Sequence, residues 1–292
     1  MMPKIYNFDS GKPGKKLLLI AGIHGDEVAP QKSMLRLISE IEAGNIVIKS
    51  GALTIIPTAN PWAAERNKRM MDVNLNRIMR VHENAALYEE KLANIIAPVI
   101  ADFDATVDLH TANTSDIPFG FNDYAEQKER ADLLDIFGLD HVIYGWNDMY
   151  PDPSSSSTDK WANDNGKLCV TIECGKHKGK DSENFAYNAA VRAMQYFDVA
   201  DIKTTFANAA AKRILMKKMV IFNTGMKFAR QFKHMDFVKS GDIIAYNESG
   251  PNIIAETDGY MIMPKEPGAE IPGEAFFYFA VNAEPKFCTT HS

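Results

Sequence analysis

Two histidines and a glutamate in this sequence could together bind a metal ion. His24 and Glu27 are three positions apart in the segment His-Gly-Asp-Glu, and His110 ends the segment Thr-Val-Asp-Leu-His. Two imidazole nitrogens and one carboxylate oxygen suit Zn²⁺ and leave a fourth position for water. A structural zinc site is normally closed by four protein ligands, usually with thiolates. The set therefore predicts an open site, although one His-x-x-Glu pattern is not rare in a chain with seven histidines.

The positions of these histidines favour the metal hypothesis. Both follow apolar segments that we expect to be strands, and Asp26 and Asp108 are available to orient their imidazoles by hydrogen bonds. The remaining histidines show no partner pattern, and we expect them on the surface or in ordinary packing. They are His82, His141, His177, His234 and His291.

A dense polar segment runs from Arg69 to Arg77 with the sequence Arg-Met-Met-Asp-Val-Asn-Leu-Asn-Arg. A guanidinium group can bind a carboxylate through two parallel hydrogen bonds and can polarise a carbonyl. A solvated charged loop is the alternative interpretation. The amides of Asn74 and Asn76 on either side of a leucine favour an ordered, hydrogen-bonded stretch instead.

Glu173 ends the otherwise apolar segment Cys-Val-Thr-Ile-Glu. Burial would raise the pKa of its carboxyl group, while a nearby dication would lower that pKa, and a balance near neutrality suits a general base. A structural partner for an arginine is an equally good interpretation of this glutamate taken alone.

Apolar runs and their spacing predict strands that alternate with helices over the first 200 residues. We expect strands at 16–22, 51–57, 106–110, 136–145 and 167–175, and helices at 28–43, 83–101 and 182–197. The second helix should be interrupted near Pro98, and the third should be capped by Asp181 or Ser182. This alternation predicts an α/β sheet with a large parallel component, in which ligands bind at the carboxyl ends of the strands.

Two other stretches do not follow this alternation of strands and helices. Residues 150–166 contain two prolines and four consecutive serines without periodicity, which predicts a long surface loop, either a lid or a disordered segment. After about residue 210, short alternating segments are separated by glycine-containing turns, which predicts a small β domain, a barrel or a sandwich. We therefore expect a catalytic domain at 1–210 and a β-rich domain at 211–292.

Composition excludes several classes of protein. The chain has 292 residues, 46% of them hydrophobic, and a net charge of −6, which argues against nucleic acid or an anionic membrane as the main partner but not against a small anionic substrate. The apolar run at 17–23 is too short to span a membrane, so we expect a cytoplasmic protein. The cysteines lack a Cys-x-x-Cys pair and predict neither a disulfide framework nor a zinc finger.

Four ordered motifs resemble a known family, the succinylglutamate desuccinylase and aspartoacylase group, which is related to the zinc carboxypeptidases. The motifs are Gly22-Ile-His-Gly-Asp-Glu27, Asn60-Pro61 followed by Arg69 and Asp72-Val-Asn-Leu-Asn-Arg77, Asp108-Leu-His-Thr111, and Thr171-Ile-Glu-Cys-Gly-Lys176. The resemblance covers residues 17–180. It implies a zinc-carboxypeptidase-like mixed sheet flanked by helices, with a smaller C-terminal all-β domain.

The resemblance also implies roles for individual residues. By position, His24, Glu27 and His110 would be the ligands of one Zn²⁺ per chain, and Glu173 would be the base that activates water. Arg69 would help to polarise the scissile carbonyl and stabilise the oxyanion. Asn76 and Arg77 would bind the α-carboxylate of the substrate.

The chain departs from the family pattern at one place. Aspartoacylases have a tyrosine and an arginine ahead of the catalytic glutamate that bind the acidic side chain of the substrate, and this chain has Asp159 and Asn163 there. This difference argues against N-acetylaspartate. Succinylglutamate is not clearly supported either, because no third arginine is placed to bind a second carboxylate. Lys160 and Lys176 are candidate substitutes for such an arginine.

The leading hypothesis is a zinc-dependent amidohydrolase, a deacylase that acts on an N-acyl amino acid or a similar small carboxylate. A metallocarboxypeptidase that acts on short peptides or cell-wall peptide stems is the alternative within the same chemistry. A third hypothesis is a binding protein whose β domain carries the function and whose metal site is vestigial. The oligomeric state is open, and a homo-oligomer is compatible with the sequence.

Overall fold

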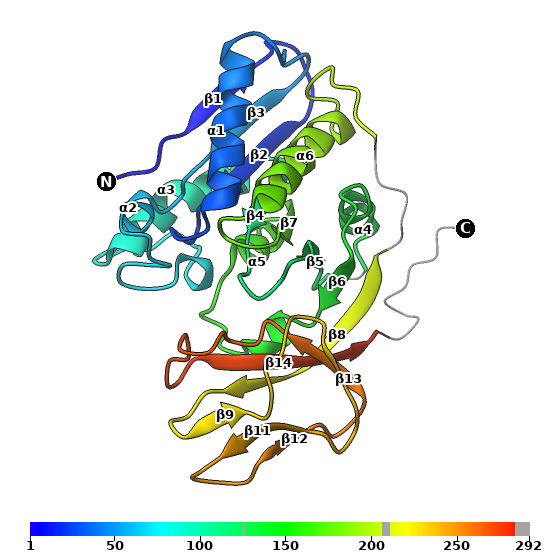
Figure 1. The fold of residues 1–292 in the computed structure, drawn as a ribbon. Helices are drawn as coiled ribbons and strands as arrows, with labels where there is room; N and C mark the ends of the chain where they lie inside the picture. The colour runs from blue at the N-terminus through cyan, green and yellow to red at the C-terminus, as the bar shows by residue number, and fades with distance from the viewer. Residues whose placement is uncertain (125, 206–210, 284–292) are drawn as a thin grey trace.

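The computed structural model describes residues 1–124, 126–205 and 211–283, which form a large mixed sheet with helices on both faces (Figure 1). In this part of the chain the strand order is β1-β3-β2-β4-β7-β5-β6-β8-β14-β13-β10, and a smaller sheet has the order β12-β11-β9. The predicted fold class, a mixed α/β sheet flanked by helices with a β-rich C-terminal region, is confirmed.

The strands that end near the site lie together in the sheet. Strands β3, β2, β4 and β7 are parallel neighbours, whereas β1 is antiparallel to β3 and β5 is antiparallel to β7. Their bounds are β1 Tyr6–Asp9, β2 Lys16–Ala21, β3 Ala52–Ile56, β4 Ala105–His110, β5 Phe119–Phe121, β6 His141–Tyr144 and β7 Leu168–Glu173.

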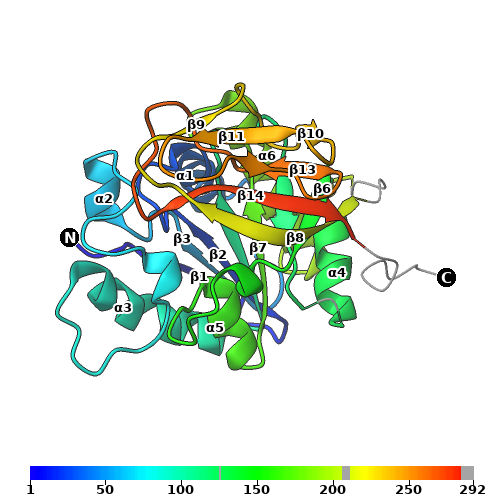
Figure 2. The same cartoon turned by 90° about the horizontal axis from the view of Figure 1, so that it is seen from below.

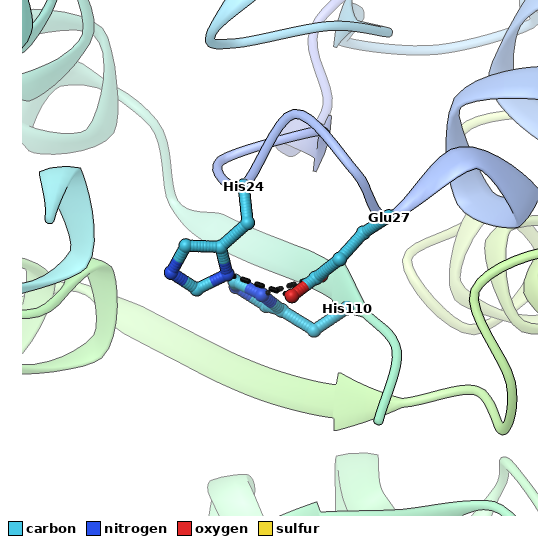
Figure 3. Close-up of side chains that lie close together, drawn as sticks. All are labelled: His24, Glu27 and His110. Atoms are coloured by element: carbon cyan, nitrogen blue, oxygen red, sulfur yellow. Dashed lines mark hydrogen bonds and ion pairs between the residues drawn. The ribbon is translucent and has the colours of Figure 1, made fainter. Parts of the chain in front are cut away.

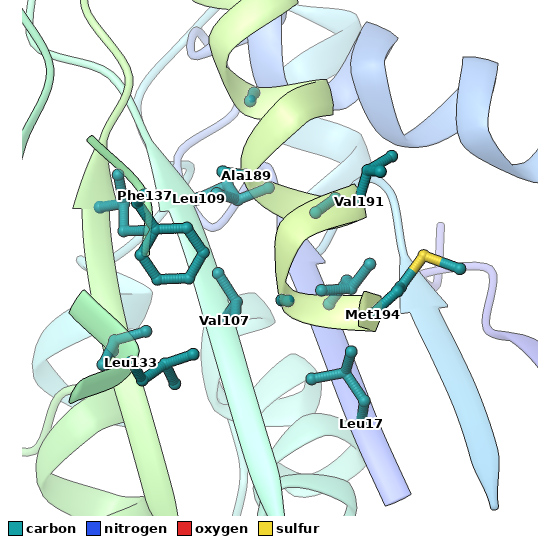
Figure 4. Packing of buried hydrophobic residues seen from close by; sticks show 14 of the residues in the cluster. Leu17, Val107, Leu109, Leu133, Phe137, Ala189, Val191 and Met194 are labelled. Atoms are coloured by element: carbon teal, nitrogen blue, oxygen red, sulfur yellow. The ribbon is translucent and has the colours of Figure 1, made fainter. Parts of the chain in front are cut away.

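Helices cover both faces of this sheet, which is why its central strands are apolar on both sides. Figure 2 shows α1 and α6 on one face and α3 and α5 on the other. In β2, Leu17 and Leu19 pack with the core under α1 and α6, and Leu18 and Ile20 pack with the core under α3. Figure 4 shows the first of these cores, with Leu17 facing α6. The helices are α1 Val28–Glu42, α2 Pro61–Glu65, η1 Leu75–Arg77, α3 Tyr88–Asp102, α4 Lys128–Asp135, η2 Asn147–Met149, α5 Thr158–Asp164 and α6 Lys180–Tyr196.

Two helices and one strand differ from the sequence expectations. Helix α3 is not interrupted at Pro98 but continues to Asp102, because Pro98 lies on the exposed side, where water can bond the carbonyl that the proline leaves without a donor. Helix α6 begins after Gly179 without a side-chain cap at Asp181 or Ser182. The expected strand at 136–145 is shorter, because residues 136–140 form the turn that follows α4 and only β6 is extended.

The stretch at 150–166 is not one long loop, because it contains α5. Ser157 caps this helix by accepting a hydrogen bond from the backbone N–H of Lys160 at 3.0 Å. The four serines suggested a loop, yet the last of them marks the beginning of a helix. Residues 150–157 do lack regular secondary structure.

The C-terminal region continues the large sheet. Strand β8 pairs in parallel with β6 and antiparallel with β14, so the hydrogen-bonded ladder passes from the first part of the chain into the last. The expected domain boundary at 210 falls within 206–210, outside the described residues, and stays a prediction. The strands are β8 Lys212–Ile221, β9 Met226–Phe228, β10 Phe237–Val238, β11 Ile243–Asn247, β12 Ile253–Ile254, β13 Gly259–Ile262 and β14 Ala275–Asn282.

The region has its own apolar core, in which Phe228 of the small sheet stacks on Phe276 of the large sheet with ring centroids 3.9 Å apart. Within the described ranges, no helix combines the length and apolar composition needed to cross a membrane.

Candidate metal centre and active site

Three neighbouring parallel strands bring the predicted site residues together. His110 and Glu173 are the last residues of β4 and β7 and face each other in register. His24 follows the end of β2 by three positions, and β2 is the other neighbour of β4. Because carboxyl ends of parallel strands meet at one edge, residues far apart in the sequence converge there.

His24, Glu27 and His110 form a compact buried group (Figure 3). Glu27 lies at the N-terminus of α1 and directs its carboxylate between the two imidazoles. Its Oε1 is 2.7 Å from Nδ1 of His24, and its Oε2 is 3.0 Å from Nδ1 of His110. One ligand atom from each residue lies within 4.8 Å of the others. These are the three residues that the sequence predicts as metal ligands.

Hydrogen bonds behind the imidazoles show that this group suits a cation. His24 Nε2 donates to Asn74 Oδ1 at 3.1 Å, an oxygen that also accepts from the backbone N–H of Asn76. His110 Nε2 donates to Asp108 Oδ2 at 2.9 Å. With both Nε2 atoms acting as donors, each neutral imidazole presents the lone pair of Nδ1 to the Glu27 carboxylate. Lone pairs facing a carboxylate repel it unless a cation or a proton lies between them, so the residues fit a metal ion.

The charges around the group point the same way. Burial lowers the pKa of His24 to about 4, so this imidazole is neutral at physiological pH, as a metal ligand must be. Burial opposes ionisation of Glu27, but the neighbouring imidazoles outweigh it and hold the pKa of Glu27 well below its ordinary value. Burial likewise opposes protonation of His110, yet the carboxylates of Asp108 and Glu27 raise its pKa well above the ordinary value. Two buried carboxylates therefore require positive charge at this place.

Glu173 and Arg69 border the group. Burial raises the pKa of Glu173 to about 8, and the negative charge of Glu27 adds to the effect. Among the described residues, no donor reaches the buried Oε2 of Glu173. Arg69 Nη1 is 3.4 Å from Oε1 of Glu27, and its side chain is 45% exposed, so part of the guanidinium remains accessible to a ligand.

Asn76 and Arg77 lie in the short helix η1, next to this group. The backbone N–H of Asn76 and Nε2 of His24 both donate to Oδ1 of Asn74, and this shared acceptor links η1 to the candidate metal ligands. Asn76 Oδ1 accepts from the backbone N–H of Thr158, so η1 is also tied to α5. Arg77 instead lies over an aromatic ring, with Cζ 4.0 Å from the ring centroid of Tyr150.

A buried glutamate that the sequence analysis did not identify orders the segment between Arg69 and η1. The carboxylate of Glu89 in α3 accepts the backbone N–H groups of residues 71, 72 and 73 at 2.7 to 3.2 Å. It also accepts from Asn60 Nδ2 at 3.0 Å. One carboxylate thus fixes the polar segment that carries both arginines, and its only sequence signal was its place in a helix directly after that segment.

Asp26, the other aspartate that we expected to orient an imidazole, has different contacts from Asp108. Asp26 does not contact the imidazoles of His24 or His110 among the described residues, and its Oδ2 lies 4.0 Å from Nε2 of His177. Asp108 is held in turn by Thr158, whose hydroxyl donates to Oδ2 at 2.5 Å. Thr158 was missed because it lies in the stretch that we expected to be a loop.

The residues at the family's side-chain-binding positions are engaged with α4. Asp159 is paired with the fully buried Arg130, and Asn163 accepts from Gln127 at 2.8 Å. The two lysines considered as substitutes are also paired, Lys160 with Asp164 at 2.6 Å and Lys176 with Asp116 at 2.7 Å.

Comparison with known proteins agrees with the motifs and the fold. Residues 13–196 match the succinylglutamate desuccinylase/aspartoacylase catalytic domain, so the chain belongs to that family. The succinylglutamate desuccinylase of Vibrio parahaemolyticus is 25% identical over 240 residues, which cover 77% of this chain and 65% of that protein. The one from Vibrio campbellii is 26% identical over 178 residues, which cover 56% of this chain and 49% of that protein. The match thus spans roughly half to two thirds of these relatives.

Solved structures share the fold over nearly the whole chain. A succinylglutamate desuccinylase/aspartoacylase from Rhodobacter sphaeroides is 17% identical with a TM-score of 0.75, over 96% of this chain and 89% of that one. The product-bound ectoine utilization protein EutE from Ruegeria pomeroyi is 20% identical with a TM-score of 0.76, over 95% of this chain and 88% of that one. The arrangement of sheet, helices and C-terminal β-rich region is therefore that of the family.

Proposed function

We propose that this protein is a zinc-dependent deacylase that hydrolyses the amide bond of an N-acyl amino acid or a similar small carboxylate. The observation that carries the proposal is the buried group of His24, Glu27 and His110, in which the Nδ1 atoms of both imidazoles face one carboxylate at the carboxyl ends of the strands. Membership of a family named after two deacylases supports it.

His24, Glu27 and His110 would hold one Zn²⁺, which when bound polarises a carbonyl and makes water more acidic. The positive charge of the ion would lower the pKa of Glu173 from its value of about 8, so that its carboxylate is available as a base near neutral pH. Glu173 then takes a proton from the attacking water and returns it to the leaving amine. Its buried Oε2, which lacks a donor among the described residues, is free for this exchange.

Other residues of the site would bind and orient the substrate. Arg69, half exposed next to Glu27, donates to the carbonyl oxygen as negative charge develops there. Asn76 and Arg77 bind the α-carboxylate. Asn76 is held in position because its backbone N–H donates to Asn74 Oδ1 and its own Oδ1 accepts from the backbone N–H of Thr158. A substrate held at both ends loses little further entropy on reaching the transition state.

The Glu173→Gln variant tests the assignment of the base. Turnover of N-acyl amino acids should fall by about 10²–10⁴-fold, because the amide cannot accept a proton. Zinc content, measured by atomic absorption, should stay near one ion per chain. The control Glu256→Gln removes an exposed carboxylate that pairs with Lys218, and it should keep full turnover. Near-normal turnover of Glu173→Gln would show that the base is elsewhere.

A chelator tests the metal. Activity should vanish in the chelator and return with Zn²⁺. Short peptides in the same assay separate deacylase from metallocarboxypeptidase activity, because a carboxypeptidase would prefer them to N-acyl amino acids. Stoichiometric zinc without hydrolysis of either class would contradict the proposed function and favour a binding protein.

A further inference from the structure

A cavity of about 190 Å³ lies beside the short helix η1, which carries Asn76 and Arg77. Its wall also includes Trp146, Tyr150 and the prolines of residues 151 and 153. We call it the aromatic cavity. One guanidinium group and several ring surfaces therefore share a single, partly open cavity, whose other lining residues are polar. Asn76 in its wall is linked through Asn74 to His24 of the candidate metal centre.

The aromatic part of the wall is built from distant parts of the chain. The Trp146 ring lies 4.8 Å from that of Phe121 in β5 and 5.1 Å from that of Tyr278 in β14, measured between centroids. The Trp146 and Tyr150 rings are 5.3 Å apart, and the hydroxyl groups of Tyr150 and Tyr278 are hydrogen-bonded. Mutual packing of this kind holds the rings in place before any ligand arrives.

Arg77 supplies the charge of the cavity. Its guanidinium lies over the ring of Tyr150 at 4.0 Å and near that of Trp146 at 5.4 Å, and Nη1 donates to the carbonyl oxygen of Asn76 at 2.7 Å. Within the described part of the chain, no carboxylate forms an ion pair with Arg77. The remaining N–H groups are thus available to an anionic ligand.

A second carboxylate on the ligand would find no unpaired cation like Arg77 in this wall. Lys160 lines the cavity but pairs with Asp164 at 2.6 Å, and Asp152 adds a negative charge. Asp159 and Asn163, at the positions where aspartoacylases bind an acidic side chain, contact Arg130 of α4 and Gln127, the residue before α4. A ligand with one carboxylate and an apolar remainder matches this distribution of charge.

We infer that the aromatic cavity binds the side chain of an aromatic amino acid, and that the substrates are N-acyl aromatic amino acids. This inference rests on the proposed deacylation and on Arg77 as the group that binds the α-carboxylate. The side chain and the carboxylate share one carbon, and the acyl group must extend toward Glu173. The side chain therefore enters the space that Arg77 lines.

The size and the chemistry of the cavity agree with this occupant. An apolar protein cavity of about 150 Å³ takes up benzene, so a cavity of about 190 Å³ has room for a phenyl ring. The parts of the Trp146 and Tyr150 rings that line the cavity can contact a third aromatic group. An aspartate side chain would instead bring a second carboxylate near Asp152, where Arg77 already holds the α-carboxylate and Lys160 is paired with Asp164, and this costs free energy.

A substrate panel on the zinc-loaded protein tests the inference. We expect kcat/KM for N-acetyl-L-phenylalanine and N-acetyl-L-tryptophan to exceed that for N-acetyl-L-alanine by at least about tenfold, with N-acetyl-L-aspartate poorest. The Tyr150→Leu variant should lose most of this preference, whereas Tyr150→Phe, which keeps the ring, should retain it. The control Trp62→Phe changes a tryptophan of α2 outside the cavity wall and should keep the preference.

Calorimetric binding of the free amino acids gives a readout that needs no turnover. L-Phenylalanine should bind at least about tenfold more tightly than L-alanine, and Tyr150→Leu should abolish the difference. Hydrolysis of alanine or aspartate derivatives as fast as aromatic ones would overturn the inference and leave the deacylase proposal standing. Absence of all hydrolysis together with selective binding of L-phenylalanine would overturn the deacylase proposal while supporting the cavity assignment. Equal binding of both amino acids would overturn the cavity assignment.

Discussion

A buried pair of histidines that connects the two parts of this protein should contribute a loss of stability when the pH falls from 7 to 5. His141 in β6 and His234 in the C-terminal region are joined by a hydrogen bond between their Nε2 atoms at 2.8 Å. His234 Nδ1 accepts from the backbone N–H of Met263 at 3.1 Å, so neutral His234 carries its proton on Nε2 and donates to His141. His141 then donates from Nδ1 to Asp140 at 3.2 Å. A further proton on either ring would place two donors face to face.

The magnitude follows from the shift in pKa. Burial lowers the pKa of His141 to about 4 from an ordinary value of 6.5, with Asp140 opposing and Lys212 reinforcing the shift. Burial and the neighbouring imidazole also hold the pKa of His234 well below its ordinary value. Between pH 6.5 and pH 4 the unfolded chain binds a proton at His141 that the folded chain does not. The contribution of this group to the free energy of unfolding is therefore complete above pH 6.5 and is lost as the pH falls toward 4. For His141 alone, the loss from pH 7 to pH 5 is about 2 kcal/mol, and His234 adds a loss of the same sign.

Urea unfolding at pH 7, 6 and 5 in the presence of EDTA would measure this dependence without a contribution from metal release. In His234→Gln, the amide can still donate to His141 but does not titrate, so its stability should fall less than that of the wild type. Ile143→Val, in the same strand, is the matched control. It should lower stability by about 1 kcal/mol at every pH and leave the dependence unchanged. Parallel curves for His234→Gln and the wild type would refute the reasoning.

Three further substitutions test the surroundings of the site. Glu89→Gln places an amide donor among four N–H groups, so the free energy of unfolding should fall by about 1–3 kcal/mol. The KM of the variant should rise more than its kcat falls, and an unchanged unfolding curve would contradict the role of Glu89. Thr158→Val removes the donor to Asp108 and should weaken Zn²⁺ affinity by about tenfold in a competition with a chromophoric chelator, whereas equal affinity would show that Asp108 needs no support. Gly25→Ala would place Cβ 2.2 Å from the backbone N of Ala64, and thermal unfolding should show a loss of about 3 kcal/mol or more; a wild-type melting temperature would argue against this close approach.

The sequence was sufficient to predict β2, β3, β4 and β7 and the residues that end them or follow them, but not the short strands β1 and β5. Strands β2, β4 and β7 are apolar runs buried on both faces, and such runs are recognisable without knowledge of their neighbours. The rule that ligands bind at carboxyl ends then places His24, His110 and Glu173 together before any coordinate is known. Helix α1 was predicted for a similar reason, since its apolar residues recur on one face.

The supporting residues could not be predicted because their roles depend on contacts between distant segments. Glu89 is a charged residue in the first turn of a helix, a position that is usually solvated, and nothing local shows that a loop will fold over it. Thr158 becomes informative only when α5 is placed against β7 and Asp108. The pair of His141 and His234 joins residues 93 positions apart, and no local pattern connects the two. Composition and periodicity carry no information on such pairs.

The hydrogen-bonded ladder from β6 through β8 to β14 also constrains how the protein can be made on the ribosome. Until Lys212–Ile221 has left the exit tunnel, β6 is an open edge on which another nascent chain could pair. Tyr278, which closes the ring cluster behind the aromatic cavity, is synthesised later still. Binding competence should therefore arise only near the end of translation, and fragments released early should be prone to aggregation rather than partly active.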